Sequence, residues 1–355
     1  MKNIIKIVIV MLTSISLFTS AYAGDLKVTG SAKATYNILS GKNQNAGKGL
    51  GVANELNFVA AGDTALGKWA YKVALDPSDA ADGGTALNDD TTLTLSTSYG
   101  TFGFFISDGG LSVQDGASSS VYGRPTDIGD PSATVDSSNI DGYNNLQYHT
   151  PAGLLPLGLQ GKIAYAPQLD NTINSANASG AVVSKGETNL GDSATMYQVS
   201  VAPVAGLSVK ADYISFKAGG TGAAATTAQK QEAGSVAATY AVGPVKVGYS
   251  ESKHAPMLTQ ATSIVAGTAE WYDQDNMSIA FAVNKELSLS YEIEESEKRM
   301  ANKAAANVKQ KSSAIQAAYT MGGMVLAVSH GSYKNNAYVA NDNADQTLLA
   351  VTMAF

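Results

Sequence analysis

The chain of 355 residues contains no cysteine, only two arginines and only three histidines. Without cysteine it has no disulfide, no thiolate nucleophile and no cysteine-ligated zinc site. The histidines, His149, His254 and His330, are scattered, and none belongs to a His-Glu-x-x-His motif. These absences argue against a structural zinc site and a zinc protease, and we expect neither a metal nor a cofactor.

Charge is also scarce, because only 15% of the residues are charged, and the formal net charge is −7. Nucleic acid attracts basic proteins, so an acidic chain is a poor nucleic-acid binder. The apolar run from Ile7 to about Phe18 falls short of the ~20 residues that a membrane-spanning helix needs, and no later run reaches that length. The sequence therefore predicts no nucleic-acid partner and no helical anchor.

The apolar run near the start of the chain fits an export signal. It follows the basic residues Lys2 and Lys6 and precedes Ala21-Tyr22-Ala23, which has the small-x-small pattern of a cleavage site. This arrangement predicts a signal peptide over residues 1–23. Residues 24–355 are then expected to form a single domain outside the cytoplasm.

The rest of the chain shows almost no helical spacing. Instead, apolar and polar residues alternate in segments broken by Gly, Asn, Asp or Pro, which is typical of strands with one apolar face. We predict sixteen strands, at residues 25–38, 49–61, 67–76, 90–99, 101–107, 142–150, 157–167, 193–203, 206–217, 230–241, 244–252, 268–283, 287–296, 311–320, 323–333 and 345–355.

The predicted connections alternate between short and long. Short turns follow the even-numbered strands, among them Tyr99-Gly100, Val204-Ala205-Gly206, Val242-Gly243-Pro244, Asn284-Lys285-Glu286 and Met321-Gly322-Gly323. Long polar loops follow the odd-numbered strands, at residues 39–48, 77–89, 108–141, 168–192, 218–229, 253–267, 297–310 and 334–344. This sorting is typical of an outer-membrane barrel. The predicted fold is therefore all-β, a transmembrane antiparallel β-barrel of sixteen strands with short periplasmic turns and long external loops.

One face of each predicted strand is apolar and the other is polar. In one strand the apolar set Leu287, Leu289, Tyr291 and Ile293 alternates with Ser288, Ser290, Glu292 and Glu294. A membrane barrel turns its apolar face to lipid and its polar face to the lumen. Side chains can fill a barrel of about eight strands, whereas sixteen strands leave room for water. The sequence thus predicts a channel with a polar lining.

The last predicted strand ends on an aromatic residue, Phe355, and residues Asn144-Asn145-Leu146-Gln147-Tyr148-His149-Thr150-Pro151 form a further local motif. With the leader, the sixteen strands and the alternating connections, these features resemble the trimeric general-diffusion porins of Gram-negative outer membranes. The resemblance implies a bacterial outer-membrane channel for passive diffusion of small hydrophilic solutes and ions. It also implies that Phe355 is read by the barrel-assembly machinery, that the protein is a homotrimer, and that it contacts outer-membrane lipid and lipopolysaccharide.

In this family the third external loop folds into the barrel and narrows the pore. The loop at that place here, about residues 108–141, is the longest connection, and it carries one cation, Arg124, and six acids, Asp108, Asp115, Asp127, Asp130, Asp136 and Asp141. The resemblance implies that basic residues on the barrel wall face these acids. The alternation along the strands predicts that the following lysines lie on the polar face: Lys27, Lys33, Lys68, Lys72, Lys162, Lys210 and Lys246. The family's wall cluster is usually rich in arginine, so a wall of lysines is a departure. Because Glu55, Glu292 and Glu294 also share the polar face, we expect weak ion selectivity that leans towards cations.

Other interpretations stay open. Loop aspartates often only cap turns, and wall lysines can solvate a lumen without any selective role. A substrate-specific channel would show an aromatic track, and a surface receptor or adhesin would use the external loops. We expect no enzyme, because no histidine lies in a recognisable catalytic setting. The apolar strand at residues 101–107 suits either a subunit contact or packing against the inward loop, and by resemblance residues 77–89 latch onto a neighbouring subunit.

Overall fold

The computed structural model describes residues 25–41, 46–75, 88–114, 117–128, 138–169, 192–217, 227–259 and 267–355. The predicted signal peptide, Asp115, Asp130, Asp136 and most of the predicted latch at residues 77–89 lie outside the described residues. Within the described ranges, no helix has the length and the apolar character needed to cross a membrane.

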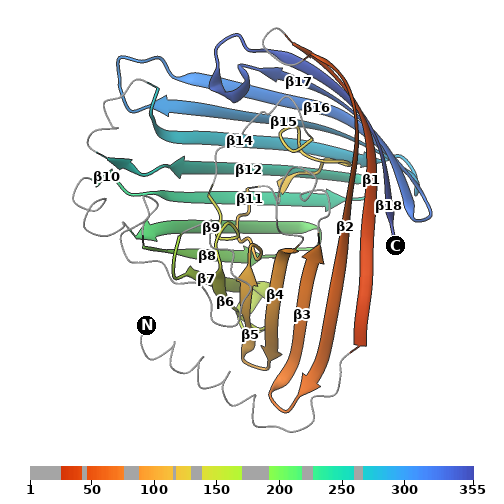
Figure 1. Cartoon of the computed structure of the whole chain (residues 1–355), viewed down its shortest axis with the longest axis vertical. Helices are drawn as coiled ribbons and strands as arrows, with labels where there is room; N and C mark the ends of the chain where they lie inside the picture. Colours follow the sequence, from red (N-terminus) through yellow and green to blue (C-terminus); the bar gives the residue numbers. More distant parts are fainter. Residues whose placement is uncertain are drawn as a thin grey trace.

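Sixteen antiparallel strands close into a barrel (Figure 1). They follow one another around the wall in chain order: β1 (Asp25–Gly41), β2 (Gly47–Thr64), β3 (Gly67–Leu75), β4 (Asn88–Thr97), β5 (Gly100–Ile106), β6 (Asn145–His149), β7 (Gln160–Ala166), β8 (Ser193–Val201), β9 (Leu207–Lys217), β11 (Glu232–Val242), β12 (Val245–Ala255), β14 (Ala269–Ala282), β15 (Leu287–Met300), β16 (Val308–Met321), β17 (Met324–Lys334) and β18 (Ala344–Ala354). Each of the sixteen predicted strands overlaps one of these, so the predicted fold class is confirmed.

Most connections are short at one rim of the barrel and long at the other, as predicted, but ten residues join β6 to β7 on the short rim and only five join β1 to β2 on the long rim. Two of the predicted loops contain a pair of short strands, β10 (Thr227–Gln229) and β13 (Leu258–Thr259), which form a separate two-stranded sheet. The side-chain amide of Gln229 donates to the carbonyls of Pro256 (2.8 Å) and Glu270 (2.7 Å), which ties these two loops together. Short 3-10 helices lie in the β6–β7 connection, η3 (Pro156–Gly158), and in the last long loop, η5 (Asn336–Tyr338).

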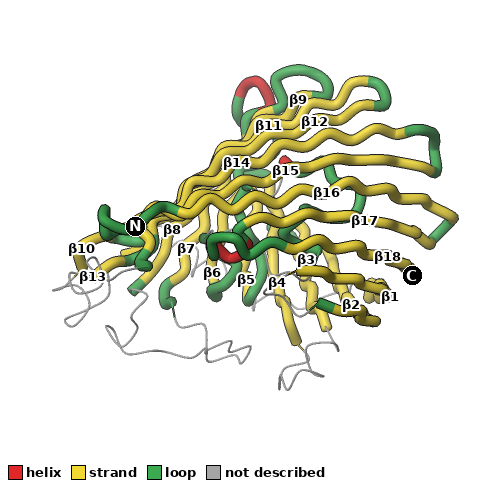
Figure 2. The backbone as a smooth tube through the Cα atoms, turned by 90° about the horizontal axis from the view of Figure 1, so that it is seen from above, coloured by secondary structure: helices red, strands yellow, loops and turns green. Residues whose placement is uncertain are grey.

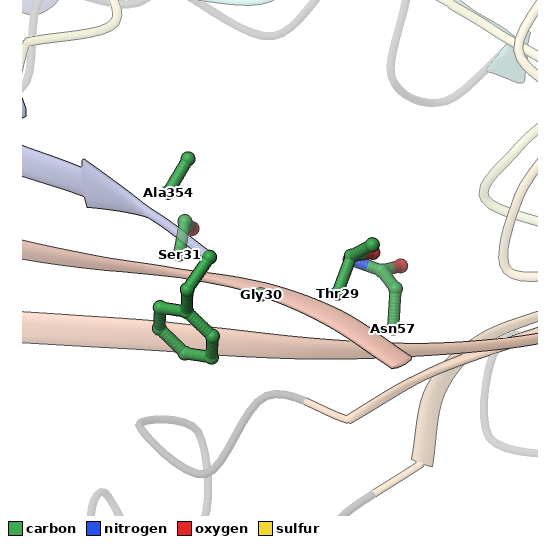
Figure 3. Close-up of a pocket in the computed structure, with 6 residues that line it drawn as sticks. Thr29, Gly30, Ser31, Asn57 and Ala354 are labelled. Atoms are coloured by element: carbon green, nitrogen blue, oxygen red, sulfur yellow. The ribbon is translucent and has the colours of Figure 1, made fainter. Parts of the chain in front are cut away.

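The barrel closes where β1 pairs with β18. Ala32 lies opposite Met353 in this register, and Phe355 continues the pairing beyond the end of β18. The amide of Gly30 donates to the Phe355 carbonyl (2.8 Å), and the Phe355 amide donates to the Gly30 carbonyl (3.0 Å). The Phe355 ring covers Gly30, where an added Cβ would overlap it. Figure 3 shows this junction, with Thr29 and Ser31 on β1, Asn57 on β2 and Ala354 on β18.

Side chains alternate between the two faces of each strand. In β14 the large apolar residues Met277, Ile279 and Phe281 are exposed, whereas Gln274, Asn276 and Ser278 are buried. Seen from above, the strands form a curved wall around the interior (Figure 2). The exposed apolar set lies on the outside of this wall, and the polar set faces inward, where an internal segment covers much of it.

The outer surface of β12 to β16 changes character along the strands. Near the short-turn rim it is apolar, but towards the long-loop rim it carries an outer ionic face, which consists of Glu251, Lys253, Asp273, Asp275, Glu295, Glu297, Arg299, Lys309 and Lys311. Arg299 contacts Asp273 (3.0 Å) and Glu297 (3.0 Å), and Lys311 contacts Glu295 (2.8 Å). The Tyr249 hydroxyl donates to Asp275 (3.2 Å) at the border between the two regions.

Candidate functional site

The connection between β5 and β6 is the segment that enters the barrel. Residues 111–128, with positions 115 and 116 outside the described residues, lie against inward side chains of the wall, and we call this segment the strap. Figure 1 shows the described part of this connection inside the barrel. The described residues of the strap pair with no strand of the barrel, so their backbone groups need side-chain partners.

Wall side chains supply those partners for the first part of the strap. Gln198 of β8 donates to the Leu111 carbonyl (2.8 Å), and the Val113 amide donates to Asp212 of β9 (2.6 Å). From β12, the Ser250 hydroxyl donates to the Gln114 carbonyl (2.9 Å). These bonds fix the height at which the strap lies against the inner wall.

Two hydroxyls and a buried carboxylate hold the middle of the strap. The Ser119 amide donates to the Ser278 hydroxyl (2.8 Å), which in turn donates to the Ala117 carbonyl (3.2 Å), while the Val121 amide donates to the Ser290 hydroxyl (3.0 Å). The side chains of Ser118, Ser120 and Asn276 all donate to the Glu292 carboxylate. Glu292 is completely buried, so these three neutral donors replace water as the hydrogen-bond partners of its carboxyl group.

Arg124 is at the centre of an ionic cluster. Its guanidinium binds Asp127 through two parallel hydrogen bonds (2.7 and 2.8 Å) and lies 3.3 Å from the Glu294 carboxylate of β15. Glu294 also accepts from the Thr126 amide (2.9 Å) and the Thr126 hydroxyl (2.7 Å). A planar guanidinium suits this two-carboxylate arrangement better than an ammonium group would.

The last part of the strap is held by neutral side chains. Gln316 of β16 accepts from the Tyr122 amide (3.1 Å) and donates to the Gly123 carbonyl (2.6 Å). The hydroxyl of Tyr333, a completely buried residue of β17, donates to the Pro125 carbonyl (2.8 Å). Gln346 of β18 donates to the Ile128 carbonyl (3.2 Å). Side chains from eight strands, β8, β9, β12 and β14 to β18, therefore bind the strap.

Apolar contacts anchor both ends of the inward connection. Leu111, Ile140 and Tyr143 pack on a buried cluster that consists of Leu169 in the connection after β7 and of the wall residues Ala164, Ala166, Ala194, Met196, Ile214, Phe216 and Ala233. Further along, Val121 and Tyr122 pack on Ala318, Ala327, Leu348 and Ala350. Burial raises the pKa of the Tyr122 phenol and of the Tyr143 phenol above the ordinary value.

Phe105 supports the start of this connection. Its ring lies over Gly103 and Gly109, where an added Cβ would overlap it, and its centroid is 6.3 Å from that of His149. Phe105 is buried, and its neighbour Phe104 points outward and is exposed. Of the two interpretations of this apolar strand, packing against the inward loop therefore accounts for its inward aromatic residue.

The register carries every predicted wall lysine to the inner face, namely Lys27, Lys33, Lys68, Lys72, Lys162, Lys210 and Lys246. Lys33 and Lys68 are exposed to the interior on β1 and β3, strands that supply none of the strap's partners named above. Lys72 lies 3.9 Å from Asp108. Among the described residues, this is the only ion pair that joins a predicted wall base to a predicted loop acid.

The predicted acids lie in different environments. Asp127 is bound to Arg124, and Asp141 accepts from Asn139 within the loop itself (2.8 Å). Glu55 accepts from Asn57 of its own strand. Glu292 and Glu294 lie on the inner wall, as parity predicts, but the strap covers them and leaves 0% and 5% of their surface exposed.

Sequence reasoning missed most of the side chains that hold the strap. Asp212, Ser250, Ser278, Gln316, Tyr333 and Gln346 were not named, and Ser290 was named only as a polar residue of its strand. One signal could have found them: the polar faces of the later strands carry Ser, Gln, Ala and Gly at most positions, with few charges. Uncharged hydrogen-bonding residues between small ones suit a wall that another segment covers.

No metal-binding cluster emerges from the described residues. They contain no group of three or more acidic or histidine side chains placed to hold a metal ion. His149 binds Gln147 (2.7 Å), His254 stacks on Tyr272, and His330 binds Thr347 (2.9 Å). The three histidines thus belong to three separate parts of the wall.

No family model matches the chain, and the curated proteins contain no match. Among solved structures, an anion-selective porin from Comamonas acidovorans has a TM-score of 0.67 at 12% identity and covers 94% of this chain and 100% of its own. Salmonella typhi OmpF in complex with daunomycin has a TM-score of 0.61 at 15% identity, with 94% and 98% covered. A variant of the Rh. blastica porin has a TM-score of 0.57 at 14% identity, with 93% and 100% covered. At these identities the likeness concerns the fold.

Proposed function

We propose that this chain, which has the sixteen-stranded fold of the porins, forms a water-filled channel in the bacterial outer membrane. Small hydrophilic solutes and ions would cross it by passive diffusion. The observation that carries this proposal is a closed barrel with an exposed apolar outer surface and a polar inner face. Such a barrel satisfies its backbone hydrogen bonds within the wall, so it is stable in hydrocarbon.

We further propose that the strap narrows the channel. The strap's hydrogen-bond partners on the wall come from β8 to β18, and its Leu111 also packs on Ala164 and Ala166 of β7, so the free path runs between the strap and the inward lysines of β1 and β3. Asp108 and Asp127 on the loop side would oppose these bases and set up a transverse field, which favours solutes that carry dipoles or charges. The expected weak preference for cations rests on the loop acids, three of which lie outside the described residues.

The proposal extends to assembly and partners. We expect a homotrimer, contacts with outer-membrane lipid and lipopolysaccharide, and recognition of Phe355 by the barrel-assembly machinery. The place of Phe355, whose backbone and ring close the barrel against Gly30, supports a role in assembly. We expect no enzymatic activity, and the separation of the three histidines supports that expectation.

Planar-bilayer recording of the purified protein tests the function. In symmetric salt we expect large, persistent conductance steps, often in groups of three. A salt gradient then gives the reversal potential and thus the preferred ion. A correctly folded barrel that leaves the bilayer silent would refute the channel and favour a barrel-borne enzyme or a surface receptor.

A further inference from the structure

Gly248 occupies a special place on the inner wall beneath the strap. It faces inward on β12, and the cross-strand register places it in one row with Ser278 of β14, Glu292 of β15 and Ala314 of β16. The strap follows this row: Ala117 lies at Gly248 and Ser278, and Ser118 and Ser120 bind Glu292.

The strap backbone rests directly on the backbone of β12 at this point. A Cβ added to Gly248 would overlap the carbonyl oxygen of Ala117 outright and would also lie 2.8 Å from the Ser278 hydroxyl. Ala117 is completely buried, and it packs with Val113 of the strap and Ala237 of β11. The overlap involves a carbonyl oxygen that the Ser278 hydroxyl holds (3.2 Å), so no flexible side chain can move away to relieve it.

Other inward glycines differ from Gly248. Gly331 of β17 and Gly103 of β5 lie under the rings of Tyr333 and Phe105, so a side chain there would meet another side chain. Gly49, an inward residue of β2, has no atom within 4 Å of an added Cβ. Gly248 is therefore the position, among these four, where a methyl group would push directly on the strap backbone.

We propose that Gly248 determines how closely the strap approaches the wall, and thereby sets the largest solute that the channel admits. This inference rests on the proposed channel function. Any side chain at position 248 lifts the strap off β12, and the strap then moves into the lumen, where the free path lies. The strap must move by about 1 Å or more to relieve the overlap. In a narrow pore, a displacement of this size is a large fraction of the difference in radius between a solute that passes and one that is excluded.

The test compares Gly248→Ala and Gly248→Val with the matched control Gly49→Ala, all as full-length protein. Heat-dependent mobility on gels first establishes that each barrel is folded. Single-channel conductance should fall by roughly a fifth to a half in Gly248→Ala and further in Gly248→Val, while Gly49→Ala stays unchanged. Graded polyethylene glycols should show a smaller exclusion limit in the same order.

A second measurement reports the strap position without any current. Because the chain has no cysteine, the pair Ala117→Cys and Ala237→Cys gives a single defined cross-link. Its yield should drop severalfold when Gly248→Ala is added. If Gly248→Ala fails to fold, Ala237→Val raises the same part of the strap from the neighbouring strand and should also reduce the conductance.

The outcomes separate the two proposals. If the unaltered protein conducts and the folded Gly248 variants show the same conductance, exclusion limit and cross-link yield as their parent, the inference about Gly248 is overturned and the channel stands. If Gly248→Ala does not fold and Ala237→Val conducts like the parent, the inference is also overturned. If the unaltered protein does not conduct, the channel function fails, and an unchanged cross-link yield would then refute the lifted strap as well.

Discussion

Arg124 is the only cation in the loop sequence from residue 108 to residue 141, and the structure buries most of its side chain beside two carboxylates. Sequence counting treated it as one positive charge against six negative ones. In the fold it binds Asp127 of the strap and Glu294 of β15, so these two carboxylates balance its charge. Arg124 therefore does more than add to the net charge of the loop, because it also clamps the strap to the wall.

Replacing Arg124 by Gln should destabilise the folded protein by about 3–5 kcal/mol, because Glu294 would stay buried without a cation. Adding Glu294→Gln should restore much of that loss, since the buried charge then disappears. Thermal unfolding in detergent measures both effects. Lys303→Gln, which breaks an exposed pair with Glu270, serves as the control and should cost less than about 1 kcal/mol. If Arg124→Gln and Lys303→Gln lowered the stability by equal amounts, Arg124 would not be a structural clamp.

Tyr333 is a second residue whose role depends on the strap. In Tyr333→Phe the Pro125 carbonyl loses its donor, which should lower stability by about 1–2 kcal/mol and increase the noise of the open-channel current. Calorimetry and single-channel recording provide the two readouts. Tyr319→Phe, on the exposed outer surface of β16, should change neither. An unchanged noise level in a folded Tyr333→Phe channel would rule out a role for this bond in holding the strap.

At this scale the sequence predicts which face a residue occupies but not what covers that face. Parity placed Glu292 and Lys72 on the inner wall correctly, because the period of a strand is fixed at two. It could not tell that Glu292 is buried under the strap whereas Lys33 on β1 is exposed. That difference arises from a contact between segments more than 150 residues apart, and no local pattern records it.

The strands themselves were largely predictable, since alternation and turn residues are local signals. All sixteen wall strands were found, but β15 extends beyond the predicted end at residue 296 to Met300. The extension carries Glu297, Lys298 and Arg299, which read as a polar loop in the sequence. They stay in the sheet because Arg299 pairs with Asp273 on the neighbouring β14. The small β10–β13 sheet escaped prediction because strands of two or three residues carry no period.

The junction of β1 and β18 leads to a prediction about assembly. Phe355→Ala removes the ring that covers Gly30, and Gly30→Val should prevent the ring from lying there. Both changes should reduce the yield of heat-modifiable, folded barrel severalfold, whereas Phe355→Tyr keeps the ring and should assemble normally. Densitometry of unheated gels measures the folded fraction. If Gly30→Val assembles as well as the parent protein, the ring is not needed in that place.

The outer surface of the molecule has an apolar region near the short-turn rim and the outer ionic face near the long-loop rim. Substitutions in the two regions can therefore show which of them lies in the membrane. Ile279→Lys places a charge among exposed apolar residues of β14 and should cost about 2–4 kcal/mol on folding into bilayers. Lys309→Ala, within the outer ionic face, should cost less than about 1 kcal/mol. Denaturant titration in lipid vesicles measures both. A similar small cost at the two positions would place the β14 surface in water.

The one-sided attachment of the strap has a consequence for how such a channel can diversify. Residues on β8 to β18 must fit the strap, so most substitutions there disturb a packed contact. Among the described residues, none of the strap's hydrogen bonds named above involves an inward side chain of β1 to β4, so the lysines of these strands can be exchanged, reversed in charge or removed at little cost to the fold. New permeability should therefore arise first on that free quarter of the wall, both in evolution and in the laboratory.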